Sequence, residues 1–305
     1  MKEENVSDND VLTPPTGVAA VTATAAPSPQ PAAPSRSARD RARRHRLAVN
    51  AGRLAVLVVV LGGWELSTRL MLVDPFFYGQ PSKVVSQIHT WISHGTSQGS
   101  LWQQINVTLE EAALGFVIGV VTGVVFGVAL GRIRFLAEVL GPYIKIMNSI
   151  PRIVLGSLFI VAFGLGLTSK VLLAIVLVFF GVFFNAFQGV REVDRNLIAN
   201  ARILGASKWR VTKEVVLPSA FTWILASLHV SFGFALIGAI VGEFLGAQHG
   251  LGLMIRTAQG TFNANGVLAA MVIIAIVALA AEGLLTVLER RLLRWRPSQL
   301  SGPDL

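Results

Sequence analysis

Two ionisable side chains are associated with the long apolar stretch at residues 219–241, where they could bind or move a charged group. His229 lies in the middle of this stretch and Glu243 follows its end. A carboxylate at membrane depth is costly and is functional by default, so Glu243 could line a translocation path or hold a helix end. His229 could be a protonatable gate or a solute ligand, although the sequence favours a neutral histidine bonded to a neighbouring helix. Both residues are candidates for a path through a membrane.

The sequence contains no spacing that is typical of an enzyme's active site. It has no G-x-x-x-x-G-K-[ST] phosphate loop, so we do not expect it to hydrolyse ATP by that route. Its five histidines show no metal-ligand spacing, and no Gly-x-Ser-x-Gly elbow is present. The lack of cysteine excludes disulfides and thiolate metal sites. We therefore predict that this chain has no catalytic residue, no metal site and no bound cofactor.

Composition indicates an all-α polytopic membrane protein. Hydrophobic residues make up 53% of the 305 residues and charged residues only 14%, which departs from the composition of soluble domains. Apolar stretches long enough to cross a bilayer recur along the chain. They predict about six transmembrane helices, at residues 54–72, 112–130, 153–167, 170–188, 219–241 and 267–288.

Two of these spans carry residue patterns that predict specific contacts. In the first, Glu65 and Arg69 are four residues apart on one helical face, which predicts an ion pair. In the second, a glycine recurs at every fourth position, which leaves one face free of side chains and lets a neighbouring helix approach closely. We expect residues 73–109 to lie outside the membrane and residues 135–152 to lie at its surface. The third span is short, so we expect it to be partly covered by protein.

The basic residues predict the orientation of the chain. Residues 1–50 are rich in Ala, Pro, Ser and Arg and are expected to be a disordered cytoplasmic tail, while residues 298–305 form a short C-terminal tail. Of the 26 Lys and Arg residues, only four fall on the outer side when both termini are placed in the cytoplasm. The net charge of +9 therefore reflects membrane topology, and no nucleic-acid partner is expected.

A polar, basic stretch interrupts the apolar segments at residues 199–218. Its sequence predicts two short helices joined at Gly205, which fits a left-handed position after a helix end. Ser207 can cap the second helix, which we expect from Lys208 to Leu217. Pro218 suits the first turn of the helix that follows.

This stretch resembles the cytoplasmic EAA loop of ABC importer permeases. Residues at the family's spacing are Ala201, Gly205, Ala206, Leu217 and Pro218. The front of the motif departs from the pattern, with Ala199 in the place of the glutamate and Asn200 in the place of the first alanine. The resemblance implies that the coupling loop, residues 190–218, docks on an ATP-hydrolysing subunit, and the lost carboxylate removes one expected polar contact.

Further runs resemble the nitrate/sulfonate/taurine-type members of that family across residues 50–297, with a transmembrane permease domain at 51–297. They are Phe163-Gly164-Leu165-Gly166, Glu243-Phe244-Leu245-Gly246-Ala247 and Gly250-Leu251-Gly252. The resemblance implies a multi-pass plasma-membrane permease of the ABC importer fold that forms a homodimer among lipids. Its partners would be two ATPase subunits that bind ATP and Mg²⁺, and an extracytoplasmic solute-binding protein.

The implied activity is uptake of a small solute, such as a nitrate-, sulfonate- or taurine-like anion, driven by ATP hydrolysis on the partner. A permease for a thiamine- or flavin-type precursor is the alternative. A competing class is an ion-coupled secondary transporter, which would use membrane carboxylates such as Glu243 and Glu282 and would need no docking loop.

Overall fold

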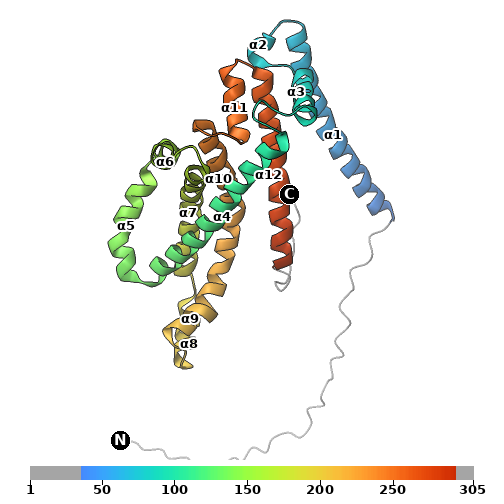
Figure 1. Ribbon diagram of the computed structural model, residues 1–305. Helices are drawn as coiled ribbons and strands as arrows, with labels where there is room; N and C mark the ends of the chain where they lie inside the picture. Colours follow the sequence, from blue (N-terminus) through green and yellow to red (C-terminus); the bar gives the residue numbers. More distant parts are fainter. Residues whose placement is uncertain (1–35, 293–305) are drawn as a thin grey trace, which may run out of the picture. The chain divides into compact units, whose positions relative to one another are not determined.

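A computed structural model describes residues 36–292, which form helices and no strand (Figure 1). The chain divides into two units, residues 1–57 and 58–305, and the described part of the first is the beginning of helix α1. The α-helices are α1 (Arg36–Arg69), α2 (Pro75–Tyr78), α3 (Pro81–Ser93), α4 (Leu101–Arg132), α5 (Arg134–Ser149), α6 (Leu155–Phe163), α7 (Leu167–Arg191), α8 (Arg195–Ile203), α9 (Lys208–Val211), α10 (Leu217–Leu245), α11 (Leu251–Gly260) and α12 (Ala264–Leu292).

The helix α1 begins inside the segment that we expected to be a disordered tail. Its N-terminal end is Arg36, so at least residues 36–50 of the expected tail are helical. Residues 1–35 and 293–305 lie outside the described part of the chain, and the expected tail at 298–305 falls among them.

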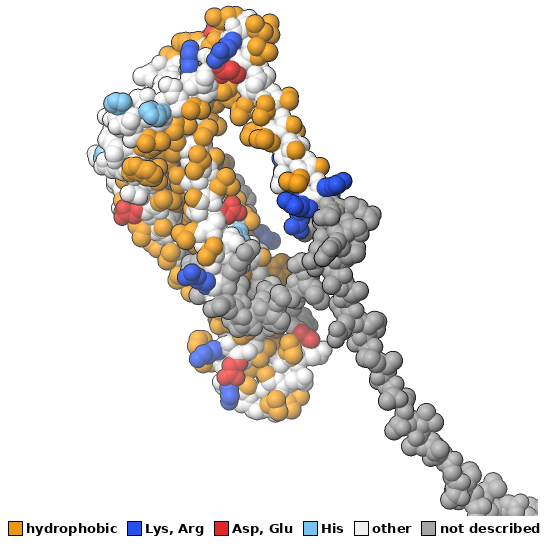
Figure 2. Space-filling model, turned by 90° about the vertical axis from the view of Figure 1, so that its right-hand side faces the viewer, with side chains coloured by type: hydrophobic (Ala, Val, Ile, Leu, Met, Phe, Trp, Pro, Cys, Tyr) orange, Lys and Arg blue, Asp and Glu red, His pale blue; other side chains and the backbone are white. Residues whose placement is uncertain are grey.

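Five described helices are long and apolar enough to cross a membrane, and a bent pair adds a sixth. They present large apolar side chains to their surroundings: Val125 of α4 is 59% exposed, Val161 of α6 85% and Leu279 of α12 69%. Figure 2 shows hydrophobic side chains distributed along the described helices on the face in view. A surface of this kind is stable in lipid and not in water.

The glycine stripe of α4 lies directly against α7. A Cβ atom on Gly115, Gly119, Gly123 or Gly127 would come within 2.3 to 2.9 Å of a side-chain carbon of α7. The α7 partners follow in the same order along the chain, from Ala174 to Ala186 at every fourth residue. The two helices are therefore parallel and their backbones are close, as the sequence predicted.

Helix α10 runs antiparallel to α7. Gly238 of α10 packs on Ala174, whereas Gly189 near the C-terminal end of α7 packs on Trp223. Because α4 and α7 are parallel, the chain between them must return to the end of the bundle where α4 begins. The returning segment is α5 and α6, which meet at an angle of 77°.

The third span is therefore not the segment 153–167 that we expected after an interfacial stretch. Helix α6 has only nine residues, and most of the return path is α5, which has sixteen. Its charged residues and Pro142 lower its hydropathy, so that its sequence is typical of a membrane surface. With α5 and α6 counted as one broken span, the described residues contain six candidate crossing segments.

Helix α4 also begins earlier than expected, at Leu101 rather than at 112, because Ser100 caps it by accepting a hydrogen bond from the Gln103 N–H. The added turns carry buried polar side chains, Gln104, Thr108 and Glu111, on the same face as the glycines. These residues matter for the site described below.

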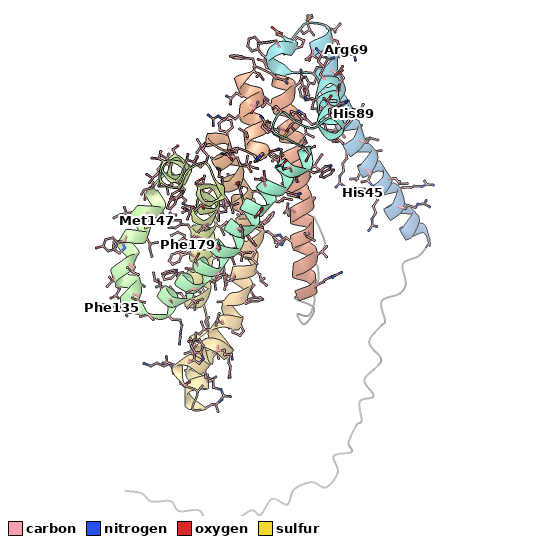
Figure 3. The ribbon with its side chains drawn as sticks, viewed as in Figure 1. His45, Arg69, His89, Phe135, Met147 and Phe179 are labelled. Carbon is pink, nitrogen blue, oxygen red and sulfur yellow. The ribbon has the colours of Figure 1, made fainter. Side chains whose placement is uncertain are left out.

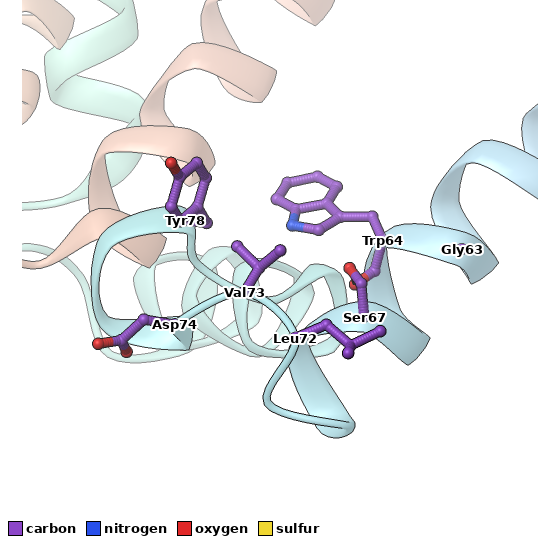
Figure 4. A pocket seen from close by; sticks show the side chains of 7 residues that line it. All are labelled: Gly63, Trp64, Ser67, Leu72, Val73, Asp74 and Tyr78. Carbon is purple, nitrogen blue, oxygen red and sulfur yellow. The ribbon is translucent and has the colours of Figure 1, made fainter.

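The end of the bundle opposite α8 and α9, here called the far end, is covered by the short helices α3 and α11. Leu101, Leu251 and Ile273 form a buried cluster that joins α4, α11 and α12. Between α1 and α3, Asp74 caps α2 by accepting a hydrogen bond from the Phe76 N–H. The connector also lines a pocket of about 490 Å³, in which the Trp64 and Tyr78 side chains lie near Val73 (Figure 4).

Candidate functional site

The loop between α7 and α10 turns at Gly205, whose backbone is left-handed with φ of 84°. The Gly205 N–H donates to the Arg202 carbonyl at 2.9 Å, and the Ala206 N–H donates to the Ala201 carbonyl at 3.0 Å. These two bonds are the Schellman pattern, which satisfies the last carbonyls of α8. The predicted glycine turn is confirmed, and so is the Ser207 cap, which accepts from the Arg210 N–H at 3.3 Å.

The second half of the loop differs from the prediction. We expected a helix ending at Leu217 and a new one at Pro218, but residues 208–245 form one continuous helix. Residues 212–216 are π-helical, and the Leu217 N–H donates to the Thr212 carbonyl five residues back. Because Pro218 has no N–H, the helix continues past it without an unsatisfied donor at that position. The loop is thus joined to α10 without a break.

The loop is fixed to the bundle by a small apolar cluster. Val190 lies in the last turn of α7 and Val193 follows that helix, whereas Val211, Val216 and Ala220 belong to the continuous helix. All five side chains are at most 7% exposed. Ala201 and Ala206 pack against this cluster. Small side chains at these two positions therefore let α8 lie close to the bundle.

The other predicted loop residues face outward or lie at the edge. Ala199, Asn200, Gly205 and Pro218 are exposed, and Leu217 is half-buried. Motif reasoning missed the most exposed apolar side chains of the loop. Ile203 is 83% exposed, Leu204 86% and Trp209 72%, and they flank the Gly205 turn. The sequence signal for this exposed surface was the presence of large hydrophobic residues in an otherwise polar loop.

Glu243 is fully buried at the end of α10. Its Oε1 accepts a hydrogen bond from the Thr108 hydroxyl at 2.6 Å, and its Oε2 accepts one from the Gly252 N–H at 2.7 Å. The Leu251 N–H donates to the Thr108 hydroxyl oxygen at 2.9 Å, and the Gly250 N–H donates to Gln104 Oε1 at 2.7 Å. Three successive amides at the start of α11 are therefore held by side chains of α4 and α10.

The glycines of the Gly250-Leu251-Gly252 run make this contact sterically possible. A Cβ atom on Gly250 would lie 2.1 Å from the Glu243 Cδ atom, and Gly250 has a φ of 116°. A Cβ atom on Gly252 would lie 2.2 Å from the Ile240 carbonyl oxygen. The carboxylate and the glycine run are thus one unit, which we call the α11 clasp: Gln104, Thr108, Glu243 and Gly250 to Gly252.

Two further buried charged side chains lie beside the clasp, and sequence reasoning missed both. Lys170 is 1% exposed, and its Nζ donates hydrogen bonds to the carbonyl oxygens of Leu165 and Gly166. Glu111 is 3% exposed, and its Oε2 has no hydrogen-bond partner among the described residues. The available signal for Glu111 was its position on the glycine face of α4. His229 lies half-buried in α10 and is not part of this cluster.

A second carboxylate performs the same task at the start of α3. Glu65 Oε2 accepts a hydrogen bond from the Ser82 N–H at 3.0 Å, while its Oε1 accepts from the Ser82 hydroxyl at 2.9 Å. The side-chain amide of Gln80 and the Arg69 Nε–H also donate hydrogen bonds to Glu65 Oε1, each at 2.7 Å. The predicted pair with Arg69 is confirmed, and its larger role is to attach α3 to α1.

Removing the Glu65 carboxylate should therefore loosen the start of α3. In Glu65→Ala, the Ser82 N–H loses its partner, so the first-turn amides of α3 should exchange with solvent at least tenfold faster than in the parent chain. Hydrogen exchange measured by mass spectrometry checks this. Glu138→Ala removes the carboxylate of another exposed pair, with Arg134, and should leave α3 unchanged. Equal exchange in both variants would contradict the cap.

The described residues contain no group of three or more His, Cys, Asp or Glu side chains that could hold a metal ion. The site thus consists of an exposed loop fixed to the bundle and a buried clasp at the opposite end.

Comparison with known proteins places this architecture in a family. Residues 115–294 match the family described as binding-protein-dependent transport system inner membrane component. A riboflavin transport system permease protein of Chloroflexus aurantiacus is 35% identical over 79% of this chain and 89% of its own length. A taurine transport system permease protein of Escherichia coli is 32% identical over 82% of this chain and 90% of its own. A putative aliphatic sulfonates transport permease protein of Bacillus subtilis is 30% identical, over 80% and 87%.

A solved structure has a related fold. A chain of the MetNI methionine ABC transporter in an inward-facing conformation superposes with a TM-score of 0.50 at 22% identity, over 64% of this chain and 93% of its own. The fold of the helical bundle is therefore similar to that of a chain of this transporter. This chain belongs to the binding-protein-dependent transport system inner membrane component family and is the membrane-spanning permease subunit of an ABC importer.

Proposed function

We propose that two copies of this chain form the transmembrane pathway of an importer, with both termini in the cytoplasm. Two ATPase subunits, which bind ATP and Mg²⁺, attach to residues 190–218, and an extracytoplasmic binding protein delivers the solute at the far end. The bias of Lys and Arg toward the loop side of the spans supports this orientation. His229 and Glu243 remain candidate path residues, and the α11 clasp supports a helix-holding role for Glu243.

The exposed loop surface carries the proposal. Ile203 and Leu204 extend from the Gly205 turn with more than four-fifths of their area exposed, although the loop backbone is capped and packed on the bundle. Apolar side chains held in this way are typical of a protein-binding surface. The position of the turn in the motif of ABC importer permeases indicates the ATPase as the protein that covers them.

The solute is best described as a small organic anion. Relatives named for taurine and aliphatic sulfonates support this class, while the relative named for riboflavin supports a flavin-type precursor as the alternative. Uptake of labelled taurine and riboflavin by cells with and without this gene would separate them. If the cells take up neither solute, taurine and riboflavin are both excluded as substrates.

Copurification tests the assembly. The tagged chain, extracted gently from its host, should carry an ATPase, and the mass of the complex should correspond to two copies of each subunit. In Gly205→Asp, the left-handed backbone and the added carboxylate should disturb the turn, so ATPase copurification and uptake should fall by at least tenfold. The chain should still insert, because nothing lies within 4 Å of a Cβ atom at this position.

Leu204→Glu tests the same surface without strain in the backbone, and Leu204→Met is its matched control. The glutamate should abolish copurification, whereas the methionine should retain it. A chain that purifies alone and still transports under an ion gradient would instead favour the secondary transporter. In that case, Glu243→Gln and Glu282→Gln would be the variants to measure.

A further inference from the structure

A cavity of about 880 Å³ lies between α5 and α7, beside the point where α4 ends. Figure 3 labels Phe135 and Met147 on α5 and Phe179 on α7, the two helices on its sides. Its size falls within the range of small-molecule sites, roughly 300–1,000 Å³. None of its lining residues belongs to the α11 clasp, and only Arg191 belongs to residues 190–218.

One wall of the cavity is aromatic. Phe183, Phe184 and Phe187 of α7 line it. The rings of Phe179, Phe183 and Phe187 stack in sequence along the helix, with centroids 5.6 and 6.1 Å apart and interplanar angles of 19° and 18°. Phe184 is 39% exposed, so part of this wall is open to an apolar occupant.

The polar groups of the cavity are mainly cationic. Arg134, Lys145 and Arg191 line it, and Glu138 is its one lining carboxylate. Glu138 is already paired with Arg134 at 2.7 Å. Among the side chains that the structure describes, neither Lys145 nor Arg191 has an ion-pair partner. The Arg191 guanidinium lies over the Phe187 ring, 5.3 Å from its centroid. Two positive charges therefore remain without a counter-charge beside an apolar surface.

This combination selects a particular kind of molecule. Guanidinium and ammonium groups bind phosphate, sulfonate and carboxylate groups through charge-assisted hydrogen bonds. The aromatic wall favours an acyl chain or a ring beside the acidic group. Basic pockets between membrane helices, at the level of the head groups, bind anionic lipids in this manner.

We propose that the cavity between α5 and α7 binds an amphipathic organic anion, with its acidic group at Lys145 and Arg191 and its apolar part against Phe183, Phe184 and Phe187. The anion comes either from the membrane, as an anionic phospholipid, or from solution, as an organic acid. Of the residues that would hold the anion, only Arg191 belongs to residues 190–218, so variants of Lys145 and Phe184 test this site separately from the ATPase partner proposed above.

Native mass spectrometry of the complex from its host tests the lipid source. After delipidation in detergent, the complex is titrated with phosphatidylglycerol and, separately, with phosphatidylcholine. One phosphatidylglycerol should bind per chain, in preference to phosphatidylcholine. The double variant Lys145→Gln/Arg191→Gln should weaken this binding roughly 30-fold, at ~1 kcal/mol for each basic group. Arg132→Gln is the matched control, because Arg132 ends α4 nearby without lining the cavity.

Benzenesulfonate tests the soluble source by equilibrium dialysis of the same samples. If it binds with the same dependence on Lys145 and Arg191 while phosphatidylglycerol shows none, the site holds a soluble anion. Phe184→Ala keeps every charge and should lower severalfold the affinity for the probe that binds. The proposal is overturned if neither probe binds, if Arg132→Gln weakens binding as much as the double variant, or if Phe184→Ala has no effect. Unchanged melting temperatures confirm that the variants are folded.

Discussion

Replacing Glu243 by alanine should lower the free energy of unfolding by about 2–5 kcal/mol and release α11 from the bundle. The carboxylate is fully buried, so its loss leaves a cavity and leaves the Gly252 N–H without a partner. The Thr108 hydroxyl loses the same acceptor. Thermal unfolding of the purified chain, combined with hydrogen exchange at residues 250–254, measures both effects.

Glu243→Gln separates the hydrogen bonds of this side chain from its charge. The amide oxygen can still accept from the Gly252 N–H, so the glutamine variant should keep most of the stability that alanine loses. A glutamine variant as unstable as the alanine variant would show that the negative charge itself is required, with Lys170 as the nearby cation. A stable glutamine variant that no longer transports would support the path role. Full protection of α11 in the alanine variant would contradict the clasp.

A single methyl group at Gly127 should lower the free energy of unfolding by about 1–3 kcal/mol. In Gly127→Ala, the new Cβ atom would lie 2.7 Å from both the Phe183 carbonyl oxygen and the Ala186 Cβ atom. The backbone of α7 cannot move aside as a flexible side chain can, so the two helices must separate. Larger side chains at this position should prevent folding of a monodisperse protein.

Gly233→Ala is the matched control for this variant. Gly233 also lies within a long span, in α10, but nothing lies within 4 Å of a Cβ atom there. The same substitution should therefore be neutral or slightly stabilising, because alanine favours a helix by roughly 1 kcal/mol over glycine. Equal melting temperatures for the two variants would rule out close packing of α4 on α7.

The sequence was most informative where local chemistry and packing agree. The glycine spacing of α4 predicted its close contact with another helix. Gly205 and Ser207 predicted the turn and the helix cap of the loop, because backbone conformation and hydrogen bonding at these positions depend on residues nearby in the sequence. Glu65 and Arg69 were predictable for the same reason. The expected number of spans, about six, agrees with the five candidate helices and one bent pair of the described residues.

Features that depend on distant neighbours could not be predicted in this way. Helix α5 has the composition of a surface helix, and its assignment as part of a span follows only from the parallel packing of α4 and α7. The roles of Gln104 and Thr108 depend on a loop more than 140 residues away along the chain. For Glu243, the sequence left a path role and a structural role open, since nothing local distinguishes a carboxylate that binds solute from one that binds backbone amides.

The continuous helix of residues 208–245 has a mechanical consequence. It joins the exposed loop surface at one end to Glu243 at the other, and its 38 residues give it a length of about 57 Å. If a bound partner tilts this helix by about 5° around its loop end, Glu243 moves by ~5 Å, which is enough to break every hydrogen bond that it makes. A small rotation at the loop is thereby converted into release of the α11 clasp at the far end.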